Sequence, residues 1–197
     1  MHKIIQRIMA VILILFGFLA FASAQNHNLD RNNTIVLTLK DGDVAIQLRP
    51  DLAPKHVDQV EKLVKEGAYD NVVFHRVIPG FMAQTGDVRF GKKGGEDYNP
   101  RRAGMGGSHY PDLYAEFSKE HFKRGTVGMA RSQNPNSANS QFFICYEDAP
   151  FLDGQYTIIG QVIKGMDIVD KIKKGSTSNN GAVDDPDIII KAHMKTQ

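Results

Sequence analysis

Residues 74–87 read FHRVIPGFMAQTGD, and this stretch sets the pattern that decides the fold. Two short runs with strand character, Val72–Ile78 and Phe81–Gln84, flank a Pro-Gly pair, which is a turn signal. Similar runs, rich in β-branched and aromatic residues, occur at positions 34–39, 44–48, 126–131, 141–145, 156–162 and 188–190. Glycine-rich loops separate them. Many short strands with Gly/Pro turns predict a mainly β protein, either a barrel or a sandwich.

Two segments have helical rather than strand periodicity. The first opens with residues 51–54, with Asp51 or a neighbour as its cap and Pro54 in its first turn, and it ends at Gly67. The second covers residues 166–173, with apolar side chains at positions 166, 169 and 172 on one side. Two helices beside many strands suit a closed barrel with plugged ends. We find no internal repeat or linker in the sequence, which predicts a single folded domain.

Further motifs lie in the second half of the chain. Residues 128–132 read GMARS, residues 139–144 read NSQFFI, and residues 151–154 read FLDG. Together with the 74–87 stretch, they resemble the signature of the cyclophilin family, in the family's order and approximate spacing. The resemblance runs from about Thr34 to the last strand. It implies a mainly β fold, a closed eight-stranded antiparallel β-barrel capped by two α-helices, and peptidyl-prolyl cis-trans isomerase activity.

The resemblance also implies roles for individual residues. Arg76 matches the catalytic arginine, which bonds the prolyl carbonyl and supports the nitrogen lone pair as amide conjugation is lost. Gln84 and Gln141 match polar groups that hold the substrate backbone, and Ala130 and Arg131 match a stretch that pairs with the peptide before proline. The residues that match the proline pocket and its edge are Phe81, Met82, Phe143, Phe151, Leu152 and Tyr156.

Proline isomerisation can be carried out by such residues alone. Rotation about an X–Pro bond crosses a barrier of about 18–20 kcal/mol but breaks no bond, so it needs no nucleophile, metal or cofactor. It needs an apolar socket and a fixed donor, and the planar, always-charged guanidinium of Arg76 suits the donor role. Taken singly, Arg76 could equally be a rim ion pair, and the apolar residues ordinary core. The alternative function is a proline-peptide-binding or chaperone module with incidental turnover, which would not need Arg76.

Three residues depart from the eukaryotic branch of the family. Phe151 stands where well-studied members carry tryptophan, whose indole N–H contacts cyclosporin, and phenylalanine has no such donor. We therefore expect weak cyclosporin binding with isomerase activity retained. Tyr156 stands where many members have histidine. Arg131 replaces asparagine and adds a charge that would favour acidic peptides. These features are typical of bacterial members.

The N-terminus has the pattern of a secretory signal peptide. Basic residues at positions 2, 3 and 7 precede an apolar run over positions 8–21, which ends in Ala22-Ser23-Ala24. We expect residues 1–24 to be a signal peptide, residues 25–33 a flexible leader and residues 34–197 the isomerase domain. The alternative is an uncleaved membrane anchor, for which the apolar run is slightly short. The predicted location is periplasmic or secreted, with unfolded protein clients and no stable membrane contact after cleavage.

Composition narrows the partners further. Removing residues 1–24 takes away Lys3 and Arg7, so 22 basic residues remain against 22 acidic ones. A formally neutral mature chain gives no argument for nucleic acid as a partner. The single cysteine, Cys145, lies in an apolar run and is interpreted as a small buried hydrophobe. The seven histidines show no metal-ligand spacing and no phosphate-loop motif occurs, so we expect no metal and no cofactor.

Overall fold

A computed structural model of the chain describes residues 33–195. The predicted signal peptide and nearly all of the predicted leader lie outside the described residues. The elements in chain order are β1 (Thr34–Leu39), β2 (Gly42–Leu48), α2 (Pro54–Lys65), β3 (Val72–Val73), β4 (Arg76–Ile78), β5 (Met82–Thr85), β6 (Thr126–Met129), β7 (Phe142–Cys145), η1 (Pro150–Leu152), β8 (Ile158–Lys164), α3 (Met166–Val169), η2 (Thr177–Asn179), β9 (Ile188–Ile189) and β10 (Lys191–Met194). The prediction of a mainly β fold with two α-helices is confirmed.

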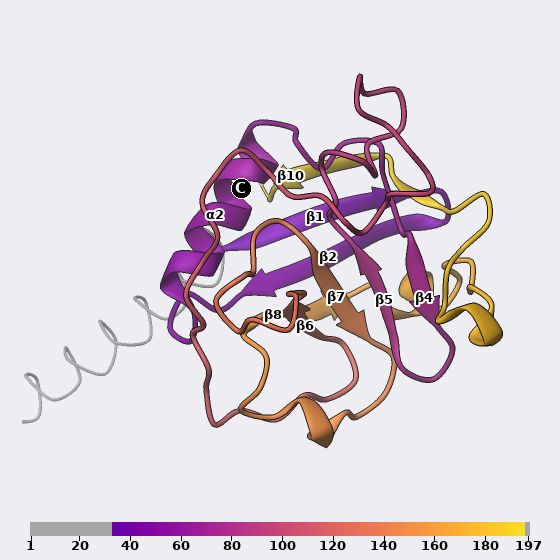
Figure 1. The fold of residues 1–197 in the computed structure, drawn as a ribbon. Helices are drawn as coiled ribbons and strands as arrows, with labels where there is room; N and C mark the ends of the chain where they lie inside the picture. The colour runs from indigo at the N-terminus through magenta and orange to yellow at the C-terminus, as the bar shows by residue number, and fades with distance from the viewer. Residues whose placement is uncertain (1–32, 196–197) are drawn as a thin grey trace, which may run out of the picture.

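Eight of the strands form one antiparallel sheet that curls into a half-barrel (Figure 1). Their order is β10-β1-β2-β8-β6-β7-β5-β4. Strands β1 and β2 form the hairpin that the Asp41-Gly42 pair predicts, and Gly42 has a φ of 138°. The register shifts at Ala45/Ile46 in β2 and at Val127/Gly128 in β6, and such irregularities bend a sheet.

The predicted closed barrel is wrong, because the edge strands β4 and β10 do not pair with each other within residues 33–195. The run predicted as one strand over residues 72–78 is split, and its first part, β3, pairs with β9 in a separate two-stranded ladder. A loop covers the outer edge of β4: the Val77 N–H donates to the Gly181 carbonyl at 2.8 Å, and the Gly175 N–H donates to the Val77 carbonyl at 2.9 Å. Since a loop satisfies this edge, β4 offers no free ladder groups there for closing the sheet.

Helix α2 begins at Pro54 and ends before Gly67, as the sequence predicts. Gly67 has a φ of 66°, a left-handed conformation that glycine adopts without strain. The predicted cap is Asp51 or a neighbour, and it is the neighbour, Ala53. Ala53 makes no side-chain cap hydrogen bond, and the Asp51 carboxylate accepts hydrogen bonds from Arg49.

The N-terminus of α2 is capped by Glu116, which lies on the long loop between β5 and β6. Its carboxylate accepts hydrogen bonds from the main-chain N–H groups of Lys55 and His56, each at 3.1 Å, and from His56 Nδ1 at 2.6 Å. Burial lowers the pKa of His56 despite the neighbouring carboxylate. Burial alone would raise the pKa of Glu116, but these hydrogen bonds outweigh it and hold the pKa below its usual value. The loop is thereby anchored to the helix.

The second helix is shorter than the predicted 166–173 segment, because α3 ends at Val169. After Val169 the hydrogen bonds span three residues instead of four. The Lys171 N–H donates to the Ile168 carbonyl, and the Ile172 N–H donates to the Val169 carbonyl. This turn leaves Ile172 buried in the main core, so the apolar spacing read from the sequence is kept without a continuous helix.

Strand β7 separates two apolar clusters. Phe142 and Ile144 point into the main core beneath α2, where the Phe142 ring meets Tyr69 edge-on with centroids 5.5 Å apart. Phe143 and Cys145 point to the other side, into a smaller cluster. This alternation follows from the two-residue period of a strand, and it aims Phe143 away from the main core.

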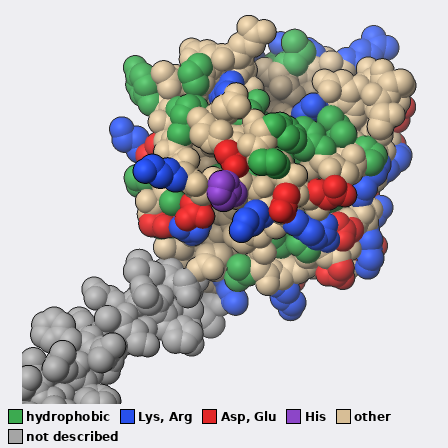
Figure 2. Space-filling model, turned by 90° about the horizontal axis from the view of Figure 1, so that it is seen from below, with side chains coloured by type: hydrophobic (Ala, Val, Ile, Leu, Met, Phe, Trp, Pro, Cys, Tyr) green, Lys and Arg blue, Asp and Glu red, His purple; other side chains and the backbone are tan. Residues whose placement is uncertain are grey.

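On the face that Figure 2 shows, acidic and basic side chains are interspersed around groups of hydrophobic ones. This face therefore has no large patch of one charge. Within residues 33–195, no helix is long and apolar enough to cross a membrane.

Candidate active site

A cavity of about 420 Å³ opens beside the smaller apolar cluster. Its lining residues are Arg76, Phe81, Met82, Gln84, Ala130, Arg131, Phe143, Phe151, Leu152, Gln155 and Tyr156. Every site residue predicted from the sequence lines this cavity except Gln141, which lines an adjoining one. The structure therefore brings the predicted residues together, and the role of each one stays a prediction.

The floor of the cavity is apolar and tightly packed. Phe143 stacks on Phe122 with centroids 5.9 Å apart, and Tyr156 meets Phe143 edge-on at 5.8 Å. Met82 and Leu152 belong to the same buried cluster. Gly128 lies opposite Phe143 on β6, and a Cβ there would come within 2.6 Å of the Phe143 ring. The absence of a side chain at Gly128 therefore lets the ring lie flat against the sheet.

The mouth of the cavity is walled by a second aromatic pair. The rings of Phe81 and Phe151 lie 5.3 Å apart, and Phe151 is 61% exposed although it is a large apolar residue. An exposed aromatic ring at the edge of an apolar cavity is suited to close over an apolar ligand. Neither ring carries a hydrogen-bond donor, so the polar groups of the site must come from elsewhere.

Arg76 supplies the positive charge of the cavity. It lies on β4 directly opposite Gln84 on β5, and its Nη1 donates to Gln84 Oε1 at 3.2 Å. Its Nε and Nη2 donate to the carbonyl and the side-chain Oδ1 of Asn180, each at 3.0 Å. Burial lowers the pKa of Arg76, yet a guanidinium stays protonated at any ordinary pH.

A chain of amides continues from Arg76 across the sheet. The Gln84 Nε2 donates to Gln141 Oε1 at 3.0 Å, and the Gln141 Nε2 donates to the carbonyls of Gly104 and Gly106. The two glutamines are thus held by protein partners on both sides, and Gln84 is the one of the pair that lines the 420 Å³ cavity. Gln141 lines the adjoining cavity and not this one, and it reaches Arg76 only through Gln84, so its role in the site stays a prediction.

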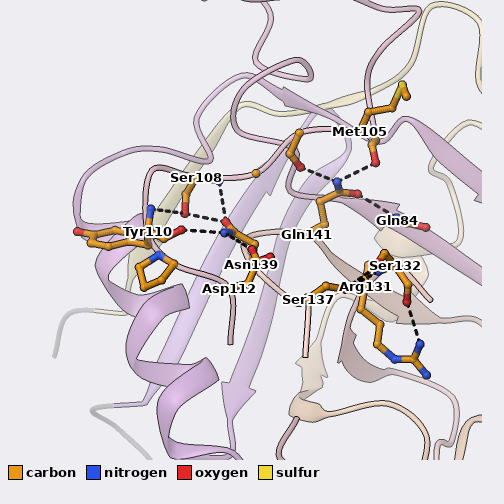
Figure 3. Close-up of a pocket in the computed structure, with 15 residues that line it drawn as sticks. Gln84, Met105, Ser108, Tyr110, Asp112, Arg131, Ser132, Ser137, Asn139 and Gln141 are labelled. Carbon is orange, nitrogen blue, oxygen red and sulfur yellow. Dashed lines mark hydrogen bonds between the residues drawn. The ribbon is translucent and has the colours of Figure 1, made fainter. Parts of the chain in front are cut away.

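A second cavity of about 790 Å³ adjoins the first and shares Gln84, Ala130 and Arg131 with it. Its walls are polar (Figure 3), and Asn139 holds much of one side together. Asn139 accepts hydrogen bonds from the Ser108 N–H and hydroxyl and donates to the Tyr110 carbonyl and to Asp112. The site therefore consists of an apolar socket beside a larger polar trough.

Arg131 is held by its own surroundings. Its Nε and Nη2 donate to the Gln155 carbonyl, its Nη1 donates to the Ser132 carbonyl, and its guanidinium lies 4.3 Å from the centre of the Tyr156 ring. Figure 3 shows this side chain extending away from Asn139 and Gln141. The arginine thus braces Tyr156 against Phe143, and the carbonyls of Gln155 and Ser132 take three of its five N–H groups. Its preference for acidic peptides stays a prediction.

Two other titratable residues near the site are inert at neutral pH. Burial lowers the pKa of His75 to about 4, so its ring is neutral, and it packs against Gly104. Burial raises the pKa of Cys145 to about 12, which keeps the thiol protonated, as its interpretation as a buried hydrophobe predicts. No group of three His, Cys, Asp or Glu side chains within residues 33–195 could hold a metal ion.

Sequence reasoning missed three residues of the site. Phe122 backs the Phe143 ring, Gln155 lines the cavity through the loop after η1, and Asn180 holds Arg76. Asn180 and Arg76 are 104 positions apart, and no local pattern links them. The Asn-Gly pair at 180–181 is a turn signal that could have drawn attention to this loop, but such a signal does not show which side chain the turn meets.

Comparison with known proteins agrees with this geometry. Residues 34–194 match the family model described as cyclophilin type peptidyl-prolyl cis-trans isomerase. A probable peptidyl-prolyl cis-trans isomerase of Brucella suis is 66% identical over 94% of this chain and 92% of its own. A cyclophilin type isomerase of Cryptosporidium parvum, crystallised in the presence of the dipeptide Ala-Pro, superposes with a TM-score of 0.69 at 27% identity, over 83% of this chain and 99% of its own. The cyclophilin AquaCyp293 of Hirschia baltica gives a TM-score of 0.68 at 26% identity, over 84% and 74% of the two chains.

The chain belongs to the cyclophilin family of proteins. Its enzyme class is that of the peptidyl-prolyl cis-trans isomerases, which confirms the activity that the sequence motifs imply.

Proposed function

We propose that this enzyme binds the proline ring of an X–Pro segment in the 420 Å³ cavity and uses Arg76 to stabilise the twisted amide. The observation that carries the proposal is the position of a restrained guanidinium at the edge of an apolar socket built by Met82, Phe143 and Leu152. An apolar socket grips the ring, and a fixed donor beside it acts on the one bond that must rotate.

The step itself is a rotation without covalent chemistry. As the amide twists, its resonance is lost, the carbonyl regains ketone character and a lone pair collects on the nitrogen. Arg76 donates to the prolyl carbonyl, and its charge faces that lone pair. Both interactions favour the twisted state over either planar isomer, as catalysis requires. A rate gain of about 10⁵ needs only about 7 kcal/mol of such preference.

The residues that flank proline lie along the polar half of the site in this proposal. Gln84 and Gln141 present amide groups to the substrate backbone, and the segment 130–132 runs beside the residues that precede proline. The Ala130 N–H already donates to the Gln141 carbonyl at 2.9 Å, so it takes no part in this pairing. Main-chain pairing of this kind depends little on side-chain identity, which suits an enzyme with many clients.

The clients in this proposal are proteins that fold outside the cytoplasm. The support is the N-terminal pattern of basic residues, an apolar run and Ala22-Ser23-Ala24. Expression of the full chain in a bacterium with an outer membrane, followed by fractionation and mass measurement, tests it. A periplasmic product that begins at Gln25 is the expected result. A cytoplasmic or membrane-bound product that still begins with the basic segment would refute it.

The mechanism is tested by cis-to-trans kinetics on a short Ala-Pro-Phe reporter peptide. Arg76→Ala is expected to lower kcat/KM by about 10²–10³-fold, and Arg76→Lys to restore little, because an ammonium lacks the planar fork. Arg49→Ala is the matched control, since Arg49 makes a rim ion pair with Asp51 away from the cavity. If Arg76→Ala is as fast as wild type, the proposed mechanism is wrong. If all forms bind proline peptides without turnover, the chain acts as a binding module.

A further inference from the structure

Asn180 meets the side chain of Arg76 with two acceptors at once. Its carbonyl oxygen lies 3.0 Å from Arg76 Nε, and its Oδ1 lies 3.0 Å from Nη2. Both can face the same way because Asn180 has a left-handed backbone, with a φ of 51°. Few residue types adopt this conformation readily, and asparagine is among them. The geometry is that of a bidentate clamp supplied by one residue.

The loop that carries Asn180 is fixed on the outer edge of β4. The Gly181 N–H donates to the Ser176 carbonyl at 2.8 Å, and the Gly181 carbonyl accepts from Val77 at 2.8 Å. A Cβ at Gly181 would come within 2.5 Å of Ile78, so the loop lies close against the strand. Arg76 begins the same strand, and the clamp is therefore attached to the element that carries its target.

The contacts with Asn180 and Gln84 leave two N–H groups of the Arg76 guanidinium free. A guanidinium has five N–H groups. In Arg76, two are used by Asn180 and one by Gln84. One N–H remains on each terminal nitrogen, and within residues 33–195 their only partner is the weak acceptor Sδ of Met82, 4.0 Å from Nη1. These two donors are available to a ligand in the cavity.

We propose that Asn180 is a positioning residue, which fixes the plane of the Arg76 guanidinium so that its two free N–H groups point into the proline cavity. The proposal rests on the proposed role of Arg76. Gln84 alone would hold one nitrogen and leave the guanidinium free to turn about its last side-chain bonds. With Asn180 on the opposite edge, the donor is oriented before the substrate arrives, and less side-chain entropy is lost in the twisted state.

The test uses a substitution that keeps the backbone. Asn180→Gly retains the left-handed conformation and the main-chain acceptor but removes Oδ1. We expect kcat to fall by about tenfold with KM for the reporter peptide within about twofold, because orientation rather than substrate binding is lost. Asn180→Asp keeps an oxygen acceptor in place and should retain kcat within about threefold of wild type.

Asn71→Gly is the matched control. Asn71 is also an exposed asparagine with a positive φ, 62°, but it lies outside the cavity lining. Its rate should equal that of wild type. Asn180→Gly is also made in the Arg76→Ala background, where it should cause no further loss, because a residue that acts through Arg76 has nothing left to position. Urea unfolding of each variant checks that the fold is intact.

Three results overturn the proposal. If Asn180→Gly has wild-type kcat while Arg76→Ala is slow, Asn180 does not position Arg76, and the proposed function stands. If Asn180→Gly slows the Arg76→Ala enzyme by the same factor as wild type, Asn180 acts by another route. If Arg76→Ala is itself fast, the proposed mechanism fails and the role of Asn180 fails with it.

Discussion

Replacing Gly128 by alanine should distort the floor of the cavity that we propose as the proline pocket. A Cβ at this position would lie 2.6 Å from Phe143 Cζ and 2.7 Å from Phe122 Cε1. Carbon atoms pack at about 3.5–4.0 Å, so each ring must retreat by about 1 Å. Overpacking of this kind costs about 1–3 kcal/mol of stability. Phe143 lines the cavity, and a shift of about 1 Å at a reacting site can cost about 10²-fold in rate.

We therefore expect Gly128→Ala to lower kcat/KM by about 10–100-fold, alongside a measurable loss in urea unfolding. The cis-to-trans assay on the reporter peptide gives the first quantity. Phe122→Ala provides the companion experiment, because it removes one of the two clashing rings, and Gly128→Ala should cost less stability in that background. A Gly128→Ala enzyme with kcat/KM within about twofold of wild type, or stability costs that simply add, would refute the packing argument.

Three further predictions concern the helix cap and the cavity mouth. Glu116→Ala removes the acceptor for two helix N–H groups and for His56, so the free energy of unfolding should fall by about 2–3 kcal/mol in urea titrations; an unchanged midpoint would show that the cap contributes nothing. Because His56 and Glu116 both have pKa values below their usual ones, the unfolded chain binds more protons in acid. Stability should be full above about pH 7 and fall in two stages, below about 6.5 and then below about 4.3, and Glu116→Ala should flatten the lower stage. Phe151→Trp adds an indole N–H beside Phe81, so inhibition by cyclosporin should strengthen by about tenfold while the isomerase rate stays within twofold; equal inhibition of both forms would exclude that donor as the cause.

The sequence predicts best where one local rule decides the structure. The run 34–39 forms β1 with the predicted bounds, and Pro54 and Gly67 bracket the first helix. The pair Phe142 and Phe143 divides between core and cavity because a strand alternates its side chains. Apart from Gln155 and Tyr156, the residues that line the cavity lie within the quoted motifs, whose order the family shares, and Tyr156 follows the last motif by two positions.

The sequence predicts poorly where a partner lies far along the chain. The run 188–190 looks like the last strand, but its apolar residues pair with β3, and the strand that joins the main sheet is β10, where only Ala192 is buried. The cap of α2 comes from Glu116, 60 positions from His56, and not from nearby Asp51. Closure of the sheet is likewise a non-local property, and it failed because a loop satisfies the edge of β4.

The orientation of Arg76 shows why the same limit applies to function. The sequence motif supplies the guanidinium but does not fix its orientation. Fixing an arginine side chain costs rotamer entropy, and an enzyme gains most when that cost is met before the substrate binds. Here the fixing groups come from β5 on one side and from the loop after η2 on the other, through Gln84 and Asn180. Gln84 in turn is held by Gln141, and Gln141 by the glycine-rich loop beside the larger cavity. In the proposed mechanism, a peptide that fills the polar trough contacts the same chain of hydrogen bonds that orients Arg76, so we expect residues upstream of proline to influence turnover as well as binding.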